Sequence, residues 1–336
     1  MTVSTEEGKT VLEAALDNGI YIPHLCYHTD LEPAGVCRLC MVDIKGRRGL
    51  SISCKTAAEH GMEIMTDTPE VNSVRRTAAK LLINNHHGDC ISCDKNTDCE
   101  LQRIAAYVGI TQGEIDRMRS PDRCLVIDRS NPFFDRDLNK CIVCGICVRT
   151  CEEIAGVNAI DFINRGYQTT VGTFGDSLLL DSPCVSCGEC VERCPVGALV
   201  PKEQEQPSRE VKTVCSYCGC GCGIYLGVRG NRIVRSRGDR KNPANRGNLC
   251  VKGRYGYEFV NSSERLTEPL VKKDGEFTEV SWDEALDLVA EKFKEHTGDS
   301  TAVLSSAKCT NEDNYVIQKF TRAVIGTNNI DHCARL

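Results

Sequence analysis

The sequence predicts an α+β protein built from several small modules, and three observations carry that prediction. Its 336 residues suffice for about two or three domains. It has 23 cysteines but only one tryptophan and 8 phenylalanines, so the small modules have thin apolar cores. Helical and strand patterns alternate clearly only after residue 268. The N-terminal part is therefore expected to depend on its cysteines for stability.

Composition narrows the class of protein. The formal net charge of −6, with 26% charged residues, gives no sign of a nucleic-acid partner. No apolar run approaches the ~20 residues that span a bilayer, and the start, MTVSTEEGKT, resembles no export signal. We therefore expect a cytoplasmic protein. There, closely spaced cysteines are more often metal ligands than disulfides, and bound metal supplies folding free energy.

The cysteines fall into five groups, each with four candidate ligands once one histidine is counted. The groups are Cys26, Cys37, Cys40 and Cys54; His86, Cys90, Cys93 and Cys99; Cys141, Cys144, Cys147 and Cys151; Cys184, Cys187, Cys190 and Cys194; and Cys215, Cys218, Cys222 and Cys250. Four other cysteines lie outside these groups: Cys124, Cys220, Cys309 and Cys333. Each group is a candidate metal centre.

The third and fourth groups form an internal repeat and give the most specific signal. CIVCGICVRTC and CVSCGECVERCP share the spacing C-x2-C-x2-C-x3-C, which wraps a [4Fe–4S] cube. In two-cluster ferredoxins the fourth cysteine of each run ligates the other cube. The rule assigns one cube to Cys141, Cys144, Cys147 and Cys194, and the other to Cys184, Cys187, Cys190 and Cys151. Zinc is the alternative, but zinc motifs typically use two separated C-x2-C pairs.

The first two groups are less specific. The spacing C-x10-C-x2-C-x13-C differs from that of plant-type [2Fe–2S] ferredoxins but shares the long loop that delivers most ligands. In the second group, His86 stands in for a thiolate, which raises an iron–sulfur potential by removing negative charge. His87 is an alternative ligand one residue away. A zinc site remains open for both groups.

The fifth group lies in a glycine-rich segment, CSYCGCGCG, whose glycines let backbone amides approach the sulfurs. Cys220 is interpreted as a spare small residue between ligands. Lys252, in CVKG, is either a surface lysine or a charge placed beside the cluster. The basic stretch from Arg229 to Lys241 is either a solvated hairpin face or a site for an anionic cofactor.

After residue 268 the pattern predicts the opening of an α/β domain. SWDEALDLVAEKFKEH is an amphipathic helix with Leu286, Val289 and Phe293 on one face, and Ser281 and Glu284 fit a capping box. TAVLSS is expected to be a buried strand and NEDNYVIQKFTRAVIG a second helix.

These residues carry a resemblance. YIPHLCYH, GVCRLCMVDI, CELQ and the doubled ferredoxin run resemble the electron-transfer region shared by iron-only hydrogenases and by the large iron–sulfur subunit of respiratory complex I and its formate dehydrogenase relatives. CSYCGCGCG, GNLCVKGRYGYEFV, SWDEALDLVA, SSAKCTNEDNY and NNIDHCARL resemble the molybdopterin oxidoreductases, specifically cytoplasmic formate dehydrogenase catalytic subunits. The resemblance covers essentially the whole chain.

The resemblance implies a domain plan and a cofactor set. It implies one [2Fe–2S] cluster, four [4Fe–4S] clusters and, in the full-length enzyme, a Mo- or W-bis-molybdopterin guanine dinucleotide, with Lys252 as an electron relay to the pterin. The domains are a β-grasp [2Fe–2S] domain over 1–75, a helical His/Cys3 domain over 76–120, a ferredoxin domain over 132–200, a linker over 201–211, a [4Fe–4S] domain over 212–268 and a truncated α/β domain over 269–336.

The resemblance also implies formate oxidation to CO2. The chain order suggests an electron route from the Cys215 group through the ferredoxin pair and the His86 group to the [2Fe–2S] cluster. The expected partner is a flavoprotein that binds NADH, a ferredoxin or a hydrogenase module. The alternatives are a stand-alone electron-transfer subunit of a hydrogenase or NADH dehydrogenase-like complex and a zinc-only structural protein.

Both chain ends depart from the family pattern. In formate dehydrogenases the segment similar to NIDHCARL is followed by the metal ligand, often selenocysteine, which UGA encodes. A chain that stops at Leu336 is therefore expected to be a reading frame cut at UGA, without catalytic residues of its own. Only TVSTEEGKT precedes the first helical pattern, so most of the first strand of the [2Fe–2S] domain is expected to be missing.

Overall fold

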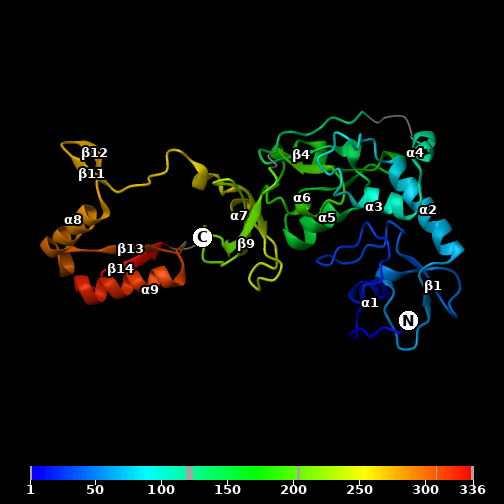
Figure 1. Ribbon diagram of the computed structural model, residues 1–336, viewed down its shortest axis with the longest axis horizontal. Coiled ribbons are helices and arrows are strands. Elements are labelled where there is room, and N and C mark those ends of the chain that lie inside the picture. The colour runs from blue at the N-terminus through cyan, green and yellow to red at the C-terminus, as the bar shows by residue number, and fades with distance from the viewer. Residues whose placement is uncertain (1, 119–123, 203–204, 308, 334–336) are drawn as a thin grey trace. The chain divides into compact units, whose positions relative to one another are not determined.

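The computed structural model divides the chain into two compact units, Met1–Glu203 and Gln204–Leu336 (Figure 1). It describes residues 2–118, 124–202, 205–307 and 309–333. Some predicted segments lie outside the described residues: 119–120 of the helical domain, 203–204 of the linker, and 334–336, after which the metal ligand is expected.

The N-terminal part of the first unit is a small sheet packed against one helix, α1 (Val11–Asp17). The antiparallel sheet has the order β2-β1-β3, formed by β1 (Met41–Ile44), β2 (Ser51–Ile52) and β3 (Ile64–Met65). Thr10 caps α1 in a reciprocal capping box with Glu13. Leu12, Ile22 and Val42 are fully buried in the core between helix and sheet. Residues 2–9 form no strand, and Thr10 makes a single β-bridge to Ala57.

Helix α2 (Pro69–Asn84) joins this sheet to a helical segment made of α3 (Glu100–Tyr107) and α4 (Gln112–Met118). The Arg75 guanidinium of α2 is completely buried, and it donates to the carbonyls of Leu39, Met41 and Thr66 at 2.7–3.1 Å. These bonds tie α2 to the chain on either side of Cys40.

A pseudo-symmetric pair of short helices follows the cysteine repeat. Helices α5 (Ile146–Arg149) and α6 (Glu189–Arg193) each begin after a glycine in the left-handed region, Gly145 at φ 73° and Gly188 at φ 74°. That conformation suits glycine, so each run turns sharply between its second and third cysteine. The module is closed by two antiparallel strand pairs: β4 (Phe134–Arg136) with β7 (Leu199–Pro201), and β5 (Asp161–Ile163) with β6 (Thr170–Gly172).

The second unit opens with an antiparallel sheet of order β10-β9-β8. Its elements are β8 (Arg209–Val214), β9 (Gly223–Arg229), β10 (Arg232–Gly238) and the short helix α7 (Val251–Tyr255). Strand β8 thus begins inside the stretch predicted as linker. The basic stretch lies mainly on the β9–β10 hairpin, where Arg237 pairs with Glu210 and stacks on Tyr225.

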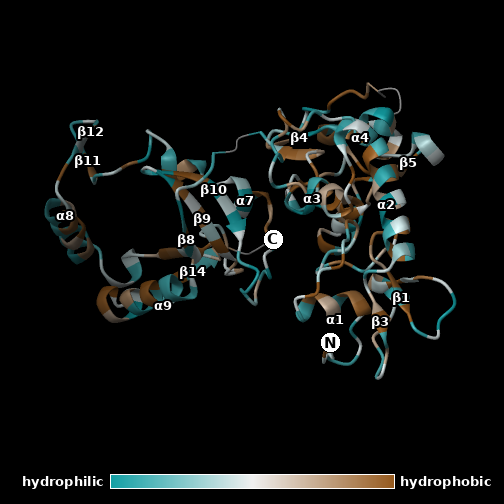
Figure 2. Cartoon of the chain, turned by 45° about the vertical axis from the view of Figure 1, so that its right-hand side comes forward, coloured by the Kyte–Doolittle hydropathy of each residue, from teal (hydrophilic) through white to brown (hydrophobic). Residues whose placement is uncertain are grey.

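The remainder contains the predicted helix–strand–helix order. Its elements are β11 (Leu270–Lys273), β12 (Glu276–Glu279), α8 (Trp282–Glu295), β13 (Val303–Ser306), α9 (Asn311–Phe320) and β14 (Ile330–Cys333). β13 and β14 pair in parallel, as a crossover helix between two strands allows. Figure 2 shows α9 alternating between hydrophobic and hydrophilic residues.

Two details of this region differ from expectation. The Ser281 hydroxyl accepts from the amide of Glu284, but the Glu284 carboxylate bonds Lys273 instead of returning to the cap. The expectation of a buried strand at TAVLSS is wrong for β13, since Leu304 is 87% exposed. Its side chain lacks the second layer that usually covers a parallel strand. None of the described helices is long and apolar enough to cross a membrane.

Candidate iron–sulfur centres

The first cysteine group lies in the N-terminal part of the first unit. Cys26, Cys37, Cys40 and Cys54 are all buried. The amide of Cys37 donates to the Cys26 sulfur at 3.4 Å. A hydrogen bond from Cys37 lowers the pKa of Cys26 to about 5, and one from Cys54 lowers the pKa of Cys40 to about 6. Half of this group therefore favours the thiolate, which is the form that binds metal.

The second group lines a cavity that encloses about 1060 Å³ of space, with His86, Cys90, Cys93 and Cys99 all in its wall. Nδ1 of His86 lies 2.8 Å from the carbonyl oxygen of Lys140, which orients the ring and makes Nε2 the nitrogen suited to bind a metal. His87 is not in that wall, and its amide bonds the carbonyl of Asn139. The structure therefore places His86, and not His87, with the cysteines.

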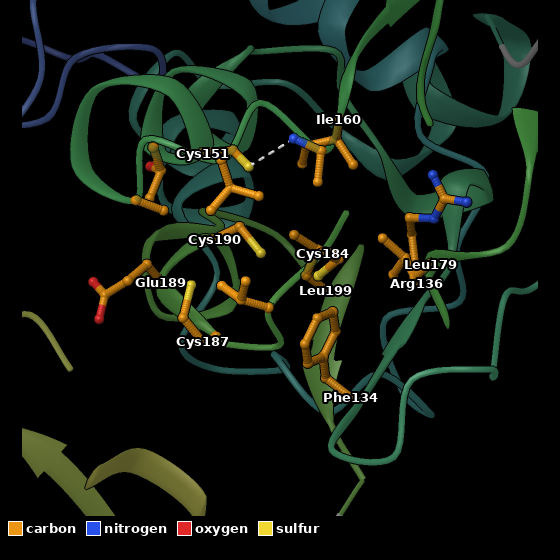
Figure 3. A pocket seen from close by; sticks show the side chains of 16 residues that line it. Phe134, Arg136, Cys151, Ile160, Leu179, Cys184, Cys187, Glu189, Cys190 and Leu199 are labelled. Carbon is orange, nitrogen blue, oxygen red and sulfur yellow. Dashed lines mark hydrogen bonds between the residues drawn. The ribbon is translucent and has the colours of Figure 1, made fainter. Parts of the chain in front are cut away.

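The two ferredoxin-type runs exchange their fourth cysteines. One cavity, with about 490 Å³ of space, is lined by Cys151 together with Cys184, Cys187 and Cys190 (Figure 3). A second cavity, with about 470 Å³, is lined by Cys194 together with the cysteines of the other run, Cys141, Cys144 and Cys147. The structure thus brings together the two crossed sets that the ferredoxin rule assigns.

The surroundings of these cavities fit iron–sulfur cubes. Backbone amides donate to three sulfurs at 3.2–3.4 Å: those of Cys141, Cys151 and Cys184. Amide donors to sulfur are a means by which proteins tune cluster potential. Burial raises the pKa of the Cys144 and Cys190 thiols, whereas coordination to a metal deprotonates a thiol outright. The donor set therefore gains from a cationic iron centre.

Arg136, Ile160 and Leu199 line both cube cavities. The Arg136 guanidinium is 3.0 Å from Asp128, and both side chains are 6% exposed. The sequence does not single out this arginine, because its only signal is its place five residues before Cys141.

The fifth group is assembled at one end of the second unit's first sheet. Cys215, Cys218 and Cys222 lie in the β8–β9 connection, where the amide of Cys215 donates to the carbonyl of Cys222 at 2.8 Å. Cys250 directly precedes α7 and interacts electrostatically with Cys215. Burial, followed by a hydrogen bond with Cys220, raises the pKa of Cys222 to about 12. The structure therefore brings the four predicted ligands to one place.

Two further residues near this group are candidates from the sequence. Lys252 is exposed on α7, two residues after Cys250. Cys220, expected to be a spare residue, lies within hydrogen-bonding reach of Cys222. Across the described residues, no three His, Cys, Asp or Glu side chains converge to hold a single metal ion.

Five protein-family models match the chain and together cover most of it. They are the 2Fe-2S iron-sulfur cluster binding domain (1–69), the NADH-ubiquinone oxidoreductase-G iron-sulfur binding region (75–114), the NADH-quinone oxidoreductase subunit 3 ferredoxin-like domain (131–200), the molybdopterin oxidoreductase Fe4S4 domain (208–262) and molybdopterin oxidoreductase (265–336). The matched domains indicate [2Fe–2S] and [4Fe–4S] clusters and a molybdopterin.

Similar proteins carry several names. The second G-type subunit of NADH-quinone oxidoreductase from Rhizobium meliloti (strain 1021) is 39% identical over 99% of this chain and 39% of its own length. NADPH-Fe(3+) oxidoreductase subunit alpha of Geobacter sulfurreducens (strain DL-1 / KN400) is 36% identical over 100% and 39%. Putative formate dehydrogenase SH0748 of Staphylococcus haemolyticus (strain JCSC1435) is 31% identical over 98% and 38%.

A solved structure is also similar. A chain of NAD+-reducing [NiFe]-hydrogenase in the H2-reduced state is 34% identical, with a TM-score of 0.54, over 60% of this chain and 84% of that one. The fold, the cysteine sites and these matches define an iron–sulfur oxidoreductase. The chain belongs to the molybdopterin oxidoreductase family, and its N-terminal iron–sulfur domains resemble those of the G-type NADH-quinone oxidoreductase subunits. It spans about two fifths of the length of the curated relatives it matches.

Proposed function

We propose that this chain is the electron-transfer part of a formate dehydrogenase. The observation that carries the proposal is the assembly of twenty candidate ligands into five sets of four. The five sets hold one [2Fe–2S] cluster and four cubes. When bound, these clusters each accept and release one electron. Formate as the substrate is supported by the resemblance to formate dehydrogenases and by the names of relatives such as the Staphylococcus haemolyticus protein.

The protein's own contribution is to position and tune these centres. Ligand type, burial and amide donors to sulfur set the potentials. The two electrons from formate would pass from a Mo- or W-bis-pterin site to the Cys215 set, with Lys252 as a relay, and onward singly. The acceptor is NAD, reached through a flavoprotein partner.

Contacts in the first unit support a route that differs from chain order. The carbonyl of Lys140, next to Cys141, orients His86, and Arg149, two residues after Cys147, donates to the carbonyl of Cys26. The cube that contains Cys141 therefore contacts both the His86 set and the [2Fe–2S] set. We propose that this cube is the junction between them, because folding, and not sequence order, decides which centres are neighbours.

A second candidate function is electron transfer in an NADH dehydrogenase-like or hydrogenase complex. It is favoured by the names of the Rhizobium meliloti relative and of the solved hydrogenase chain. The two candidates differ in the donor that reduces the clusters.

The test is to incubate the full-length protein anaerobically with formate and to follow the visible absorbance of the clusters. Bleaching by formate supports formate dehydrogenase. Reduction only by NADH or H2 with the matching partner, and none by formate, supports the second candidate and refutes formate as the substrate.

A further inference from the structure

The segment from Cys26 to Glu32 is held by both ferredoxin-type cysteine runs. Arg149, between Cys147 and Cys151, donates from Nη2 to the carbonyl of Cys26 and from Nη1 to that of Glu32, both at 2.6 Å. Arg193, between Cys190 and Cys194, donates from Nη2 to Asp30 Oδ2 at 2.8 Å. Each run thus contributes one arginine to this contact, which spans more than a hundred residues of sequence.

The contact has the features of a built interface. The Arg193 side chain is 3% exposed and also pairs with Glu189 of α6, so its buried charge is compensated. The amide of Glu32 donates to the Glu153 carboxylate at 2.8 Å, which adds a third link. Arg149 uses the planar fork of its guanidinium to bind two carbonyls at once, a geometry that lysine cannot reproduce.

The contact also brings two candidate centres close together. Cys26 belongs to the [2Fe–2S] set, and Cys147 belongs to the cube set of Cys141. Burial raises the pKa of the Cys144 thiol in that same cube set, and the charge of Cys26 adds to the rise. The two sites therefore lie within electrostatic range of each other.

Resting on the function proposed above, we propose that Arg149 and Arg193 form a clamp that couples the [2Fe–2S] site electronically to the cube site of Cys141, Cys144, Cys147 and Cys194. The path runs from the Cys26 carbonyl through one hydrogen bond to Arg149 and along two residues to Cys147. One electron crosses per step: one centre is oxidised, the other is reduced, and no bond or proton changes at the arginines. Both are positioning residues.

The proposal is tested on the cluster-loaded chain with Arg149→Met, Arg149→Lys and Arg193→Met. Arg165→Met is the matched control, since Arg165 is exposed in the same module. One readout is the microwave power at which the EPR signal of the reduced [2Fe–2S] cluster saturates, because a nearby reduced cube speeds its relaxation. The other is hydrogen exchange of the Glu32 amide.

We expect Arg149→Met to saturate at lower power and to exchange the Glu32 amide faster, with unchanged iron content. Arg149→Lys should lie between Arg149→Met and the unaltered chain, because it keeps the charge but only one donor direction. Arg193→Met should shift both readouts in the same direction, and Arg165→Met should shift neither.

Unchanged saturation and exchange in Arg149→Met would overturn the clamp while leaving the proposed function intact. Loss of the [2Fe–2S] signal in both Arg149 variants would also overturn it, because the arginine would then serve assembly and not coupling. Absence of any [2Fe–2S] signal from the unaltered chain would instead refute the proposed function.

Discussion

Replacement of Asp128 by alanine should open the module that holds both cubes. The carboxylate of Asp128 pairs with Arg136 at 3.0 Å and also accepts from the amides of Ser130 and Leu179, each at 3.0 Å. The change leaves a guanidinium buried without its partner. Breaking a buried ion pair from one side costs about 3–5 kcal/mol.

The assay is hydrogen exchange of the β4 and β7 amides, because local opening reports on this module without unfolding the whole chain. At about 1.4 kcal/mol per factor of ten, protection should fall by roughly a hundred- to several-thousand-fold. The control is Arg129→Ala, which breaks the ion pair with Asp135, whose Arg129 side chain is 66% exposed; it should cost no more than about 1 kcal/mol. A loss of protection below tenfold in Asp128→Ala would refute the reasoning.

The same pair gives a pH dependence. Burial raises the pKa of Asp128, but hydrogen bonds from Ser130 and Leu179 and the charge of Arg136 outweigh it, so the pKa is lowered. A lowered pKa in the folded state means that the stabilisation is present above the unfolded value of about 3.9 and is lost as pH falls through the folded value. Protection of β4 should therefore decline below pH 4 in the unaltered chain, and Asp128→Asn should flatten that decline.

Three further predictions follow from single residues. Cys194→Ser should remove the cube of the Cys141 run and leave that of its own run, seen as a loss of about four iron atoms and of one EPR signal; loss of the other cube would contradict the crossed assignment. His86→Cys should keep its cluster at a lower midpoint potential, whereas His87→Cys should leave the potential unchanged in an EPR redox titration. Thr10→Ala removes the cap of α1 and should lower the free energy of local unfolding of that helix by about 1 kcal/mol, measured by hydrogen exchange; no change would show that the cap is dispensable.

The sequence predicts best what depends on local spacing. The crossed cysteine sets follow from the ferredoxin rule, because four cysteines on one tight run reach only part of a cube. The order of α8, β13 and α9 follows from hydrophobic periodicity, which local side-chain patterning determines. Burial does not follow from it, and so the pattern places Leu304 inside while the structure exposes it.

Features that depend on distant contacts are beyond the reach of local patterns. The choice of His86 over His87 rests on the carbonyl of Lys140, 54 residues away. Arg149 and Arg193 stand in plain view within the cysteine runs, but nothing local shows that they bind the segment from Cys26 to Glu32. The electron route inferred from chain order fails to anticipate these contacts for the same reason.

The measurement that tests the central claim most directly is a Mössbauer spectrum of the chain assembled with labelled iron, together with total iron. Five sets of four ligands predict about 18 iron atoms per chain, of which about one ninth belong to a [2Fe–2S] cluster and the rest to [4Fe–4S] cubes. Zinc in place of iron, or a spectrum without a [2Fe–2S] component, would contradict the account.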